Sequence, residues 1–141
     1  MTKRTVSLVL LLTFALGAFA QTTGKTFTRS FNADGNTRIR LDLPGIVDLK
    51  IWNSPTVRLE IAVSLPAANV SVLDQLATVG RYDLKAESTG QALTISAPNL
   101  NKVVRLKGEE LRETVSYVVF VPKGLEVVLL STQAVAGVQK K

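Results

Sequence analysis

The sequence predicts a mainly β fold, an antiparallel β-sandwich or β-roll of about eight short strands with one short helix. Three observations lead to this class. Apolar and polar residues alternate over most of the chain, turn-forming residues interrupt the alternation at short intervals, and one stretch follows a helical spacing instead. Because a period of two places successive side chains on opposite faces of a strand, each alternating stretch has one face suited to burial.

The first half of the alternating region contains four predicted strands, at residues 25–31, 36–43, 46–52 and 56–65. Turn signals separate them: Asn32 to Gly35, Pro44-Gly45, and Asn53 to Pro55. We expect the last three strands to form an antiparallel meander with one buried face. Its outward face would carry a net charge of only +1, from Arg38, Arg40, Lys50 and Arg58 against Asp42, Asp48 and Glu60.

The one helical stretch spans residues 69–79. Val72, Leu73, Leu76 and Val79 follow the three- and four-residue spacing of a helix, with Asn69 as a possible N-cap and Gly80 as the stop signal. A loop ending in a strand is the alternative, since β-branched residues form weak helices unless they are packed.

Alternation returns in the second half. Tyr82, Leu84 and Ala86 share one face of a strand that we expect to form a hairpin with residues 93–97. Residues 99–113 predict a short strand and an exposed loop. Residues 114–121 are apolar on both faces toward their end and are therefore predicted to be a central strand. A last strand is expected at 125–130, followed by a frayed end.

The first twenty residues have the three parts of a secretory signal peptide. Lys3 and Arg4 precede an apolar run from Val6 to Leu16, and Ala18-Phe19-Ala20 supplies the small residues of a cleavage site before Gln21. A retained membrane anchor is the alternative, but the run is shorter than the ~20 residues of a spanning helix. We expect a signal peptide at 1–20 and a single β-rich domain at 21–141, exported to the periplasm, the outer surface or the extracellular medium. Cleavage would lower the net charge from +6 to +4.

The chain has no Cys and no His. Disulfide scaffolds, zinc or haem sites built on these residues, and Ser-His-Asp or Cys-His catalysis are therefore excluded. Phosphate-binding and dinucleotide-binding motifs are also missing. Asp34, Asp42 and Asp48 do not match a calcium loop. We therefore predict no cofactor, no metal site and no nucleic-acid partner.

Glu109, Glu110 and Glu113 are the remaining acid–base candidates. As hydrolase carboxylates they would have to face each other in a cleft. A run of mixed charges is more typical of a solvated loop, so we predict no catalytic residues.

Four residues are candidate contacts for a ligand or partner: Trp52, Tyr82, Arg105 and Lys107. Trp52 lies on the face of its strand that otherwise carries polar residues. There it either contacts a ligand or covers the end of the sheet. Tyr82, with Leu73 and Leu76, would line an apolar cavity if the domain binds a small ligand. Arg105 and Lys107 belong to the densest basic group, although three acids follow it.

Several stretches resemble a known family. These are the signal peptide, the strand ending in Phe31, the run from Val47 to Ile61, and the segments 91–95 and 118–125. They are similar to the bacterial auto-transporter adhesin, or head GIN domain, group. They are also similar to related adhesin-like β domains of exported Bacteroidetes proteins. Such domains usually continue into Gly- and Ser-rich β-solenoid coils after the step at Pro122, and this chain departs from them there. The resemblance implies an adhesin-like role and supplies no catalytic residues.

We therefore expect a non-enzymatic, adhesin-like interaction or structural module of the cell envelope. Its partner would be a protein or glycan at the cell surface, and free sheet edges could give a homo-oligomer. A β domain that binds a small ligand or glycan is the alternative, and a carboxylate-based hydrolase is a third reading. No membrane span is expected after signal cleavage.

Overall fold

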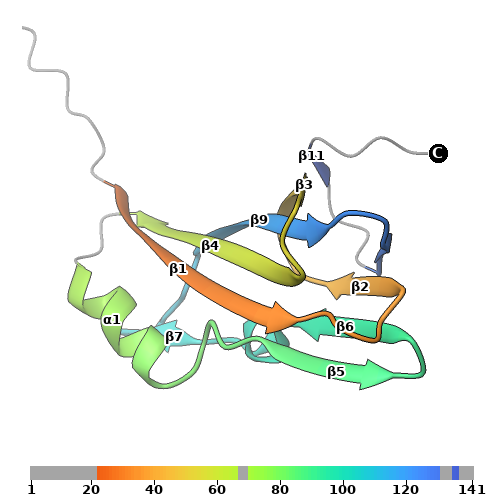
Figure 1. The fold of residues 1–141 in the computed structure, drawn as a ribbon. Coiled ribbons are helices and arrows are strands. Elements are labelled where there is room, and N and C mark those ends of the chain that lie inside the picture. Colours follow the sequence, from red (N-terminus) through yellow and green to blue (C-terminus); the bar gives the residue numbers. More distant parts are fainter. Residues whose placement is uncertain (1–21, 67–69, 131–134, 137–141) are drawn as a thin grey trace, which may run out of the picture.

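The computed structural model describes residues 22–66, 70–130 and 135–136, and shows two β-sheets packed face to face (Figure 1). The five-stranded sheet has the order β1 (Thr22–Asn32), β4 (Thr56–Pro66), β9 (Thr114–Pro122), β3 (Ile46–Trp52) and β11 (Val135–Ala136). The four-stranded sheet has the order β10 (Glu126–Leu129), β2 (Arg38–Asp42), β6 (Ala92–Ser96) and β5 (Lys85–Thr89). The predicted mainly β, sandwich-like class is confirmed.

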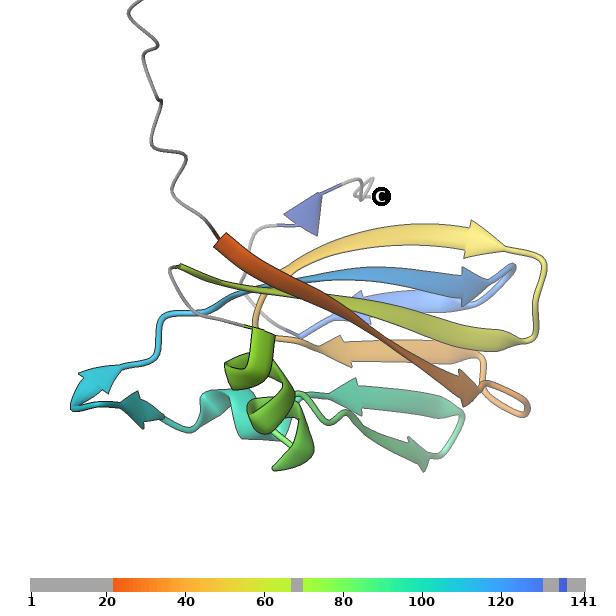
Figure 2. The ribbon, with the colours of Figure 1, turned by 90° about the vertical axis from the view of Figure 1, so that its left-hand side faces the viewer.

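Three further elements lie at one end of the sandwich. They are helix α1 (Val70–Thr78), the 3-10 helix η1 (Pro98–Asn101), and a small hairpin made by β7 (Arg105–Leu106) and β8 (Glu109–Glu110). Figure 2 shows this hairpin, in cyan, reaching beyond the ends of both sheets. No helix among the described residues is long and apolar enough to cross a membrane. The predicted signal peptide lies outside the described residues.

The core forms where the alternating faces of the two sheets meet. The odd-numbered apolar residues of β4, from Val57 to Leu65, are all buried, as the period of two predicts. Tyr117, Val119 and Val121 of β9 join them, and Ile39 and Ile95 come from the other sheet. Fully burying one side chain of this kind contributes about 1.5–3 kcal/mol, so this core is the main stabilising term.

The prediction of an antiparallel meander is wrong. β2 and β3 belong to different sheets, and β9 lies between β3 and β4. β3 pairs with β9 in parallel, and β2 pairs in parallel with both β6 and β10, so the sheets are mixed. The Pro44-Gly45 turn carries the chain from one sheet to the other instead of closing a hairpin. The charged face predicted for the meander is accordingly divided between the two sheets.

Gly45 explains part of this crossing. A Cβ at this position would lie 2.4 Å from the carbonyl oxygen of Val115 and 3.2 Å from the ring of Tyr117. Only a glycine lets the turn approach the start of β9 this closely. β9 is a central strand, as predicted. It pairs with β4 on one side and with β3 on the other.

Two other expectations need correction. β5 begins at Lys85, so Tyr82 and Leu84 precede the β5–β6 hairpin; the chain turns at Gly80–Asp83, where the Asp83 amide donates to the Gly80 carbonyl at 3.2 Å. The C-terminal stretch expected to be frayed contributes β11, which pairs with Val47 and Asp48 of β3. Residues 131–134 and 137–141 lie outside the described residues.

Replacing Gly45 by Ala tests the crossing. We expect Gly45→Ala to lower the free energy of unfolding by about 1–3 kcal/mol, because the added methyl group overlaps a backbone carbonyl that cannot rotate away. Urea denaturation measures the loss. Gly24→Ala is the matched control, since its Cβ would lie at an ordinary 3.6 Å from the Val63 carbonyl oxygen. Equal stability of both variants would contradict this account.

Candidate functional site

The site begins at the C-terminal end of α1. Gly80 has a φ of +84°, its amide donates to the Ala77 carbonyl at 3.0 Å, and the Arg81 amide donates to the Leu76 carbonyl at 3.0 Å. This is the Schellman pattern that commonly ends a helix, and it confirms the predicted stop at Gly80. The predicted N-cap Asn69 lies outside the described residues. The turn that ends α1 directs the side chains of Arg81 and Tyr82 into the interior.

Arg81 and Glu113 form a buried ion pair, with side chains only 8% and 7% exposed. The Arg81 Nε donates to Glu113 Oε1 at 2.8 Å, and its Nη2 donates to the same oxygen. The Tyr82 hydroxyl donates to the other oxygen, Oε2, at 2.6 Å. A buried charge is tolerated only when it is paired and its hydrogen bonds are made, and both conditions hold here.

The guanidinium of Arg81 also fixes the chain that leads into the hairpin. Its Nη1 donates to the carbonyl oxygens of Asn99, at 3.1 Å, and Lys102, at 2.8 Å, where η1 ends. The Asn99 side-chain amide in turn donates to the Gly80 carbonyl at 2.8 Å. We call Arg81, Tyr82, Asn99 and Glu113 the clamp. It joins the end of α1, the end of η1 and the residue before β9.

Two buried tyrosines are affected by the clamp. Burial, the hydrogen bond to Glu113 and the charge of Glu113 raise the pKa of Tyr82 well above its ordinary value. Burial, followed by the charge of Glu113, does the same to the pKa of Tyr117. The Tyr117 hydroxyl has no hydrogen-bond partner among the described residues. Both phenols are therefore held in the neutral form.

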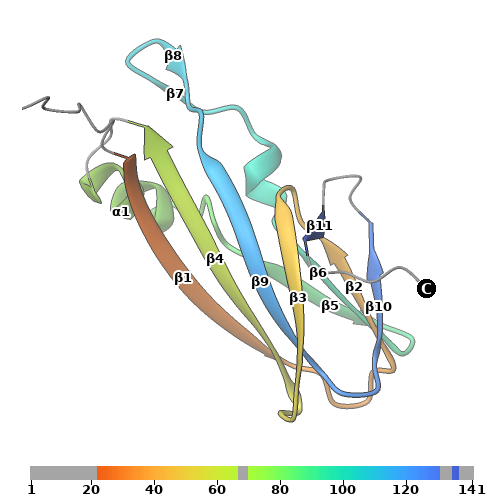
Figure 3. The ribbon, with the colours of Figure 1, turned by 90° about the horizontal axis from the view of Figure 1, so that it is seen from above.

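The hairpin extends from the clamp into solvent (Figure 3). Its two-residue turn is Lys107-Gly108, with φ angles of 51° and 81°, the conformation of the type I′ turns that suit tight hairpins. The Leu111 amide donates to the Val104 carbonyl at 2.7 Å and closes its base. Arg105, Lys107, Glu109 and Glu110 are all exposed. The hairpin therefore presents charged side chains on a short two-stranded ribbon.

An open pocket lies on each side of the hairpin base. The first, of about 450 Å³, is lined by the clamp residues Arg81 and Glu113 together with η1 and the following chain. The second, of about 480 Å³, lies between the end of β4 and the hairpin and includes Leu65, Pro66 and Leu106. Glu110, Leu111 and Arg112 border both pockets. Their volumes fall in the range of ligand sites, roughly 300–1,000 Å³.

The structure separates the four predicted contact residues. Arg105 and Lys107 lie together on the exposed hairpin. Tyr82 is buried against Phe27, with ring centroids 5.4 Å apart, so its ring is part of the core. Leu73 and Leu76 are also buried in the core and line neither pocket.

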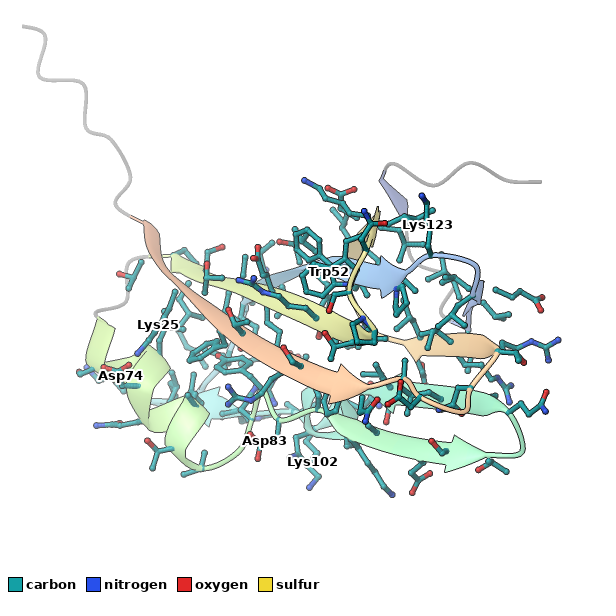
Figure 4. The ribbon with its side chains drawn as sticks, in the orientation of Figure 1. Lys25, Trp52, Asp74, Asp83, Lys102 and Lys123 are labelled. Atoms are coloured by element: carbon teal, nitrogen blue, oxygen red, sulfur yellow. The ribbon has the colours of Figure 1, made fainter. Side chains whose placement is uncertain are left out.

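Trp52, the last residue of β3, lies on the outer side of the five-stranded sheet (Figure 4). Its ring packs on Phe120 with centroids 5.2 Å apart, and its Nε1 donates to the Thr56 carbonyl at 2.8 Å. Trp52 thus covers the end of the sheet, the second of the two roles considered for it.

The three candidate glutamates have different environments. Glu109 and Glu110 are exposed on β8, whereas Glu113 has both oxygens occupied by Arg81 and Tyr82. No three acidic side chains among the described residues gather closely enough to hold a metal ion.

Sequence reasoning missed Arg81 and Asn99. The only signal for Arg81 was its place directly after a helix-ending glycine, where a chain turns inward. Nothing in the sequence marked Asn99 or paired Arg81 with Glu113, because these residues lie far apart along the chain.

Comparison with known proteins gives little further information. No family model matches the chain, and no curated protein matches it significantly. One matching solved structure is described as a "putative cell adhesion protein" from Clostridium sporogenes, with 13% sequence identity and a TM-score of 0.43. The match covers 76% of this chain and only 46% of that one. A likeness at this level establishes neither a shared fold nor a shared function.

The two tyrosines give a pH test of the clamp. The chain contains only Tyr82 and Tyr117. Because folding raises the pKa of both above the unfolded value of about 10, their contribution to stability is complete below pH 10 and is lost as the pH rises further. In an alkaline absorbance titration we expect no tyrosinate near pH 10 in the native chain, and normal titration in urea. Reversible ionisation near pH 10 without unfolding would contradict the buried clamp.

Proposed function

We propose that the chain is an exported, non-enzymatic, adhesin-like module that binds a protein or glycan at the cell envelope through the β7–β8 hairpin. The observation that carries this proposal is the contrast between the hairpin and its base. Exposed Arg105 lies on β7 and exposed Lys107 on the two-residue turn that follows, while the buried clamp holds the chain that leads into this hairpin. Binding residues are typically found on loops that a rigid scaffold positions in this way.

Export and an adhesin-like role rest on the sequence. The residues at 1–20 have the pattern of a signal peptide, and the resemblance to adhesin-like β domains agrees with action outside the cytoplasm. A secreted chain that begins at Gln21 would support export, whereas a retained Met1 would oppose it. The clamp favours a non-enzymatic role, because the most buried of the three candidate glutamates, Glu113, holds the structure together instead of facing another carboxylate.

Binding of a small ligand or glycan remains the second candidate. It is favoured by the two pockets at the hairpin base, which place apolar side chains such as Leu106 and Leu111 beside charged ones such as Arg112. Both candidates use the same end of the molecule. They differ in the size of the partner that would be found.

A charge-reversal variant tests the hairpin. We expect Arg105→Glu with Lys107→Glu to reduce binding of the purified chain to intact bacterial cells at least about tenfold, since charges at an interface set both attraction and partner choice. Flow cytometry of the labelled chain measures binding. Protease treatment of the cells would then remove a protein partner, and periodate oxidation would remove a glycan.

The matched control is Arg40→Glu with Lys85→Glu, which changes the net charge equally at exposed positions of the four-stranded sheet. Binding by this control at the wild-type level would locate the contact on the hairpin. Equal binding by both variants, or no binding by the wild-type chain, would oppose the proposed function.

A further inference from the structure

The outer face of the five-stranded sheet is the face turned away from the four-stranded sheet. On β3 it carries every second residue, namely Ile46, Asp48, Lys50 and Trp52. Each of these lies beside an alternate residue of β9, and the alternate residues of β4 lie on the far side of β9. Ile46 is 49% exposed, and Trp52, Phe120 and Val118 are partly exposed. Partly exposed apolar side chains that gather on one face of a sheet make that face a candidate interaction surface.

Strand register arranges the charges of this face in two rows that run across the strands. Arg58 of β4, Phe120 of β9 and Lys50 of β3 lie side by side and form the cation row. The acid row lies two residues further along each strand and consists of Glu60, Val118 and Asp48, side by side. Each row therefore has two like charges flanking one apolar side chain.

The cation row is held in place by its aromatic centre. The Lys50 ammonium lies 6.0 Å from the centroid of the Phe120 ring, and the Arg58 guanidinium lies 5.8 Å from it. Arg58 also bonds Glu60 at 3.2 Å along its own strand, but its Nε is buried without a hydrogen-bond partner among the described residues. The two cations of the row are thus held against the Phe120 ring.

The positions on either side of these rows differ in size. Beyond the cation row lie Trp52 and Pro122, which are paired in register. Beyond the acid row lie Ala62, Ser116 and Ile46. The small side chains on that side leave an open hollow of about 290 Å³ that includes Thr26, Ala62 and Ser116. This hollow lies over β1, β4 and the start of β9 and does not include Ile46 of β3.

We propose that this face binds a second copy of the chain in a two-fold symmetric dimer. A two-fold axis that runs along the rows, midway between the cation row and the acid row, places each row against the other row of the second copy. Lys50 then faces Asp48, Arg58 faces Glu60 and Phe120 faces Val118. The same operation sets Trp52 against Ile46 and Pro122 against Ser116, so that partly exposed apolar side chains of the two copies meet at β3.

Three features favour a second copy over a different partner. The four charges of the two rows sum to zero, so the face attracts neither a polyanion nor a strongly cationic surface. In an isologous interface, the same patch of both copies is in contact. Such a patch must be complementary to itself after a two-fold rotation. Sheets that pack face to face also keep their strands aligned within about 30°, which preserves contacts near the central strand β9.

Charge reversal and charge exchange test the dimer. We expect the purified chain to dimerise with increasing concentration in sedimentation velocity. Lys50→Glu alone and Asp48→Lys alone should each weaken dimerisation at least about tenfold, because each places two like-charge contacts in the dimer. Combining both substitutions should restore dimerisation, since the exchanged charges again face opposite charges. An effect on folding alone would not be restored in this way.

Lys85→Glu on the edge strand β5 is the control and should dimerise like the wild-type chain. A wild-type chain that stays monomeric at all concentrations would overturn the proposal. So would a dimer insensitive to Lys50→Glu, or a double variant that does not recover. The proposal is independent of the hairpin function, because the Arg105→Glu and Lys107→Glu variant should lose binding to cells and keep the dimer.

Discussion

The buried ion pair between Arg81 and Glu113 is the interaction on which the arrangement of this end of the molecule depends. The two side chains come from the end of α1 and from the residue before β9, and Arg81 also binds the carbonyls at the end of η1. Such a pair is weak evidence for net stability, because the cost of removing two charges from water offsets their attraction. We expect its main effect to be on specificity: its contacts join the segments where the chain leaves the sandwich and enters the hairpin.

The second constraint is the position of β9. Because β9 lies between β3 and β4, the registers on its two sides together decide which side chains share the outer face. The clamp and the hairpin lie at one end of the molecule, and the charged rows lie on the flat side of a sheet. The fold thus has two surfaces with different chemistry: a projecting charged hairpin and a sheet face on which the charges of the two rows sum to zero. A dimer formed through the sheet face, as proposed above, would leave the hairpin free.

Local features of the fold were predictable from the sequence. The period of two located β3 and β4 almost to the residue, and the spacing of Leu73 and Leu76 located α1. Strand pairing was not predictable, because alternation specifies the buried face and says nothing about the neighbour. The short turn at Pro44-Gly45 therefore suggested a hairpin, whereas a close backbone contact between Gly45 and Val115 makes it a crossing between sheets.

The site was predictable only in part, for the same reason. Arg105 and Lys107 are predicted contacts because they belong to a dense basic group, and the structure exposes both of them. The sequence places Tyr82 beside Leu73 and Leu76 in an expected ligand cavity, whereas its hydroxyl binds Glu113, which lies 31 residues away. Arg81 was missed because a single arginine beside a glycine has no distinctive pattern. Tertiary contacts between distant residues leave no local signal.

Hydrogen exchange at the hairpin tests the role of the clamp most directly. The variant Arg81→Met, Tyr82→Phe, Glu113→Leu replaces the buried polar groups with apolar side chains and leaves no charge unpaired. If the clamp provides specificity, the amide of Leu111, which closes the hairpin base, should exchange at least about tenfold faster than in the wild-type chain, while amides of the central strand β9 keep their protection. Unchanged protection at Leu111 would contradict the claim that the ion pair positions the hairpin.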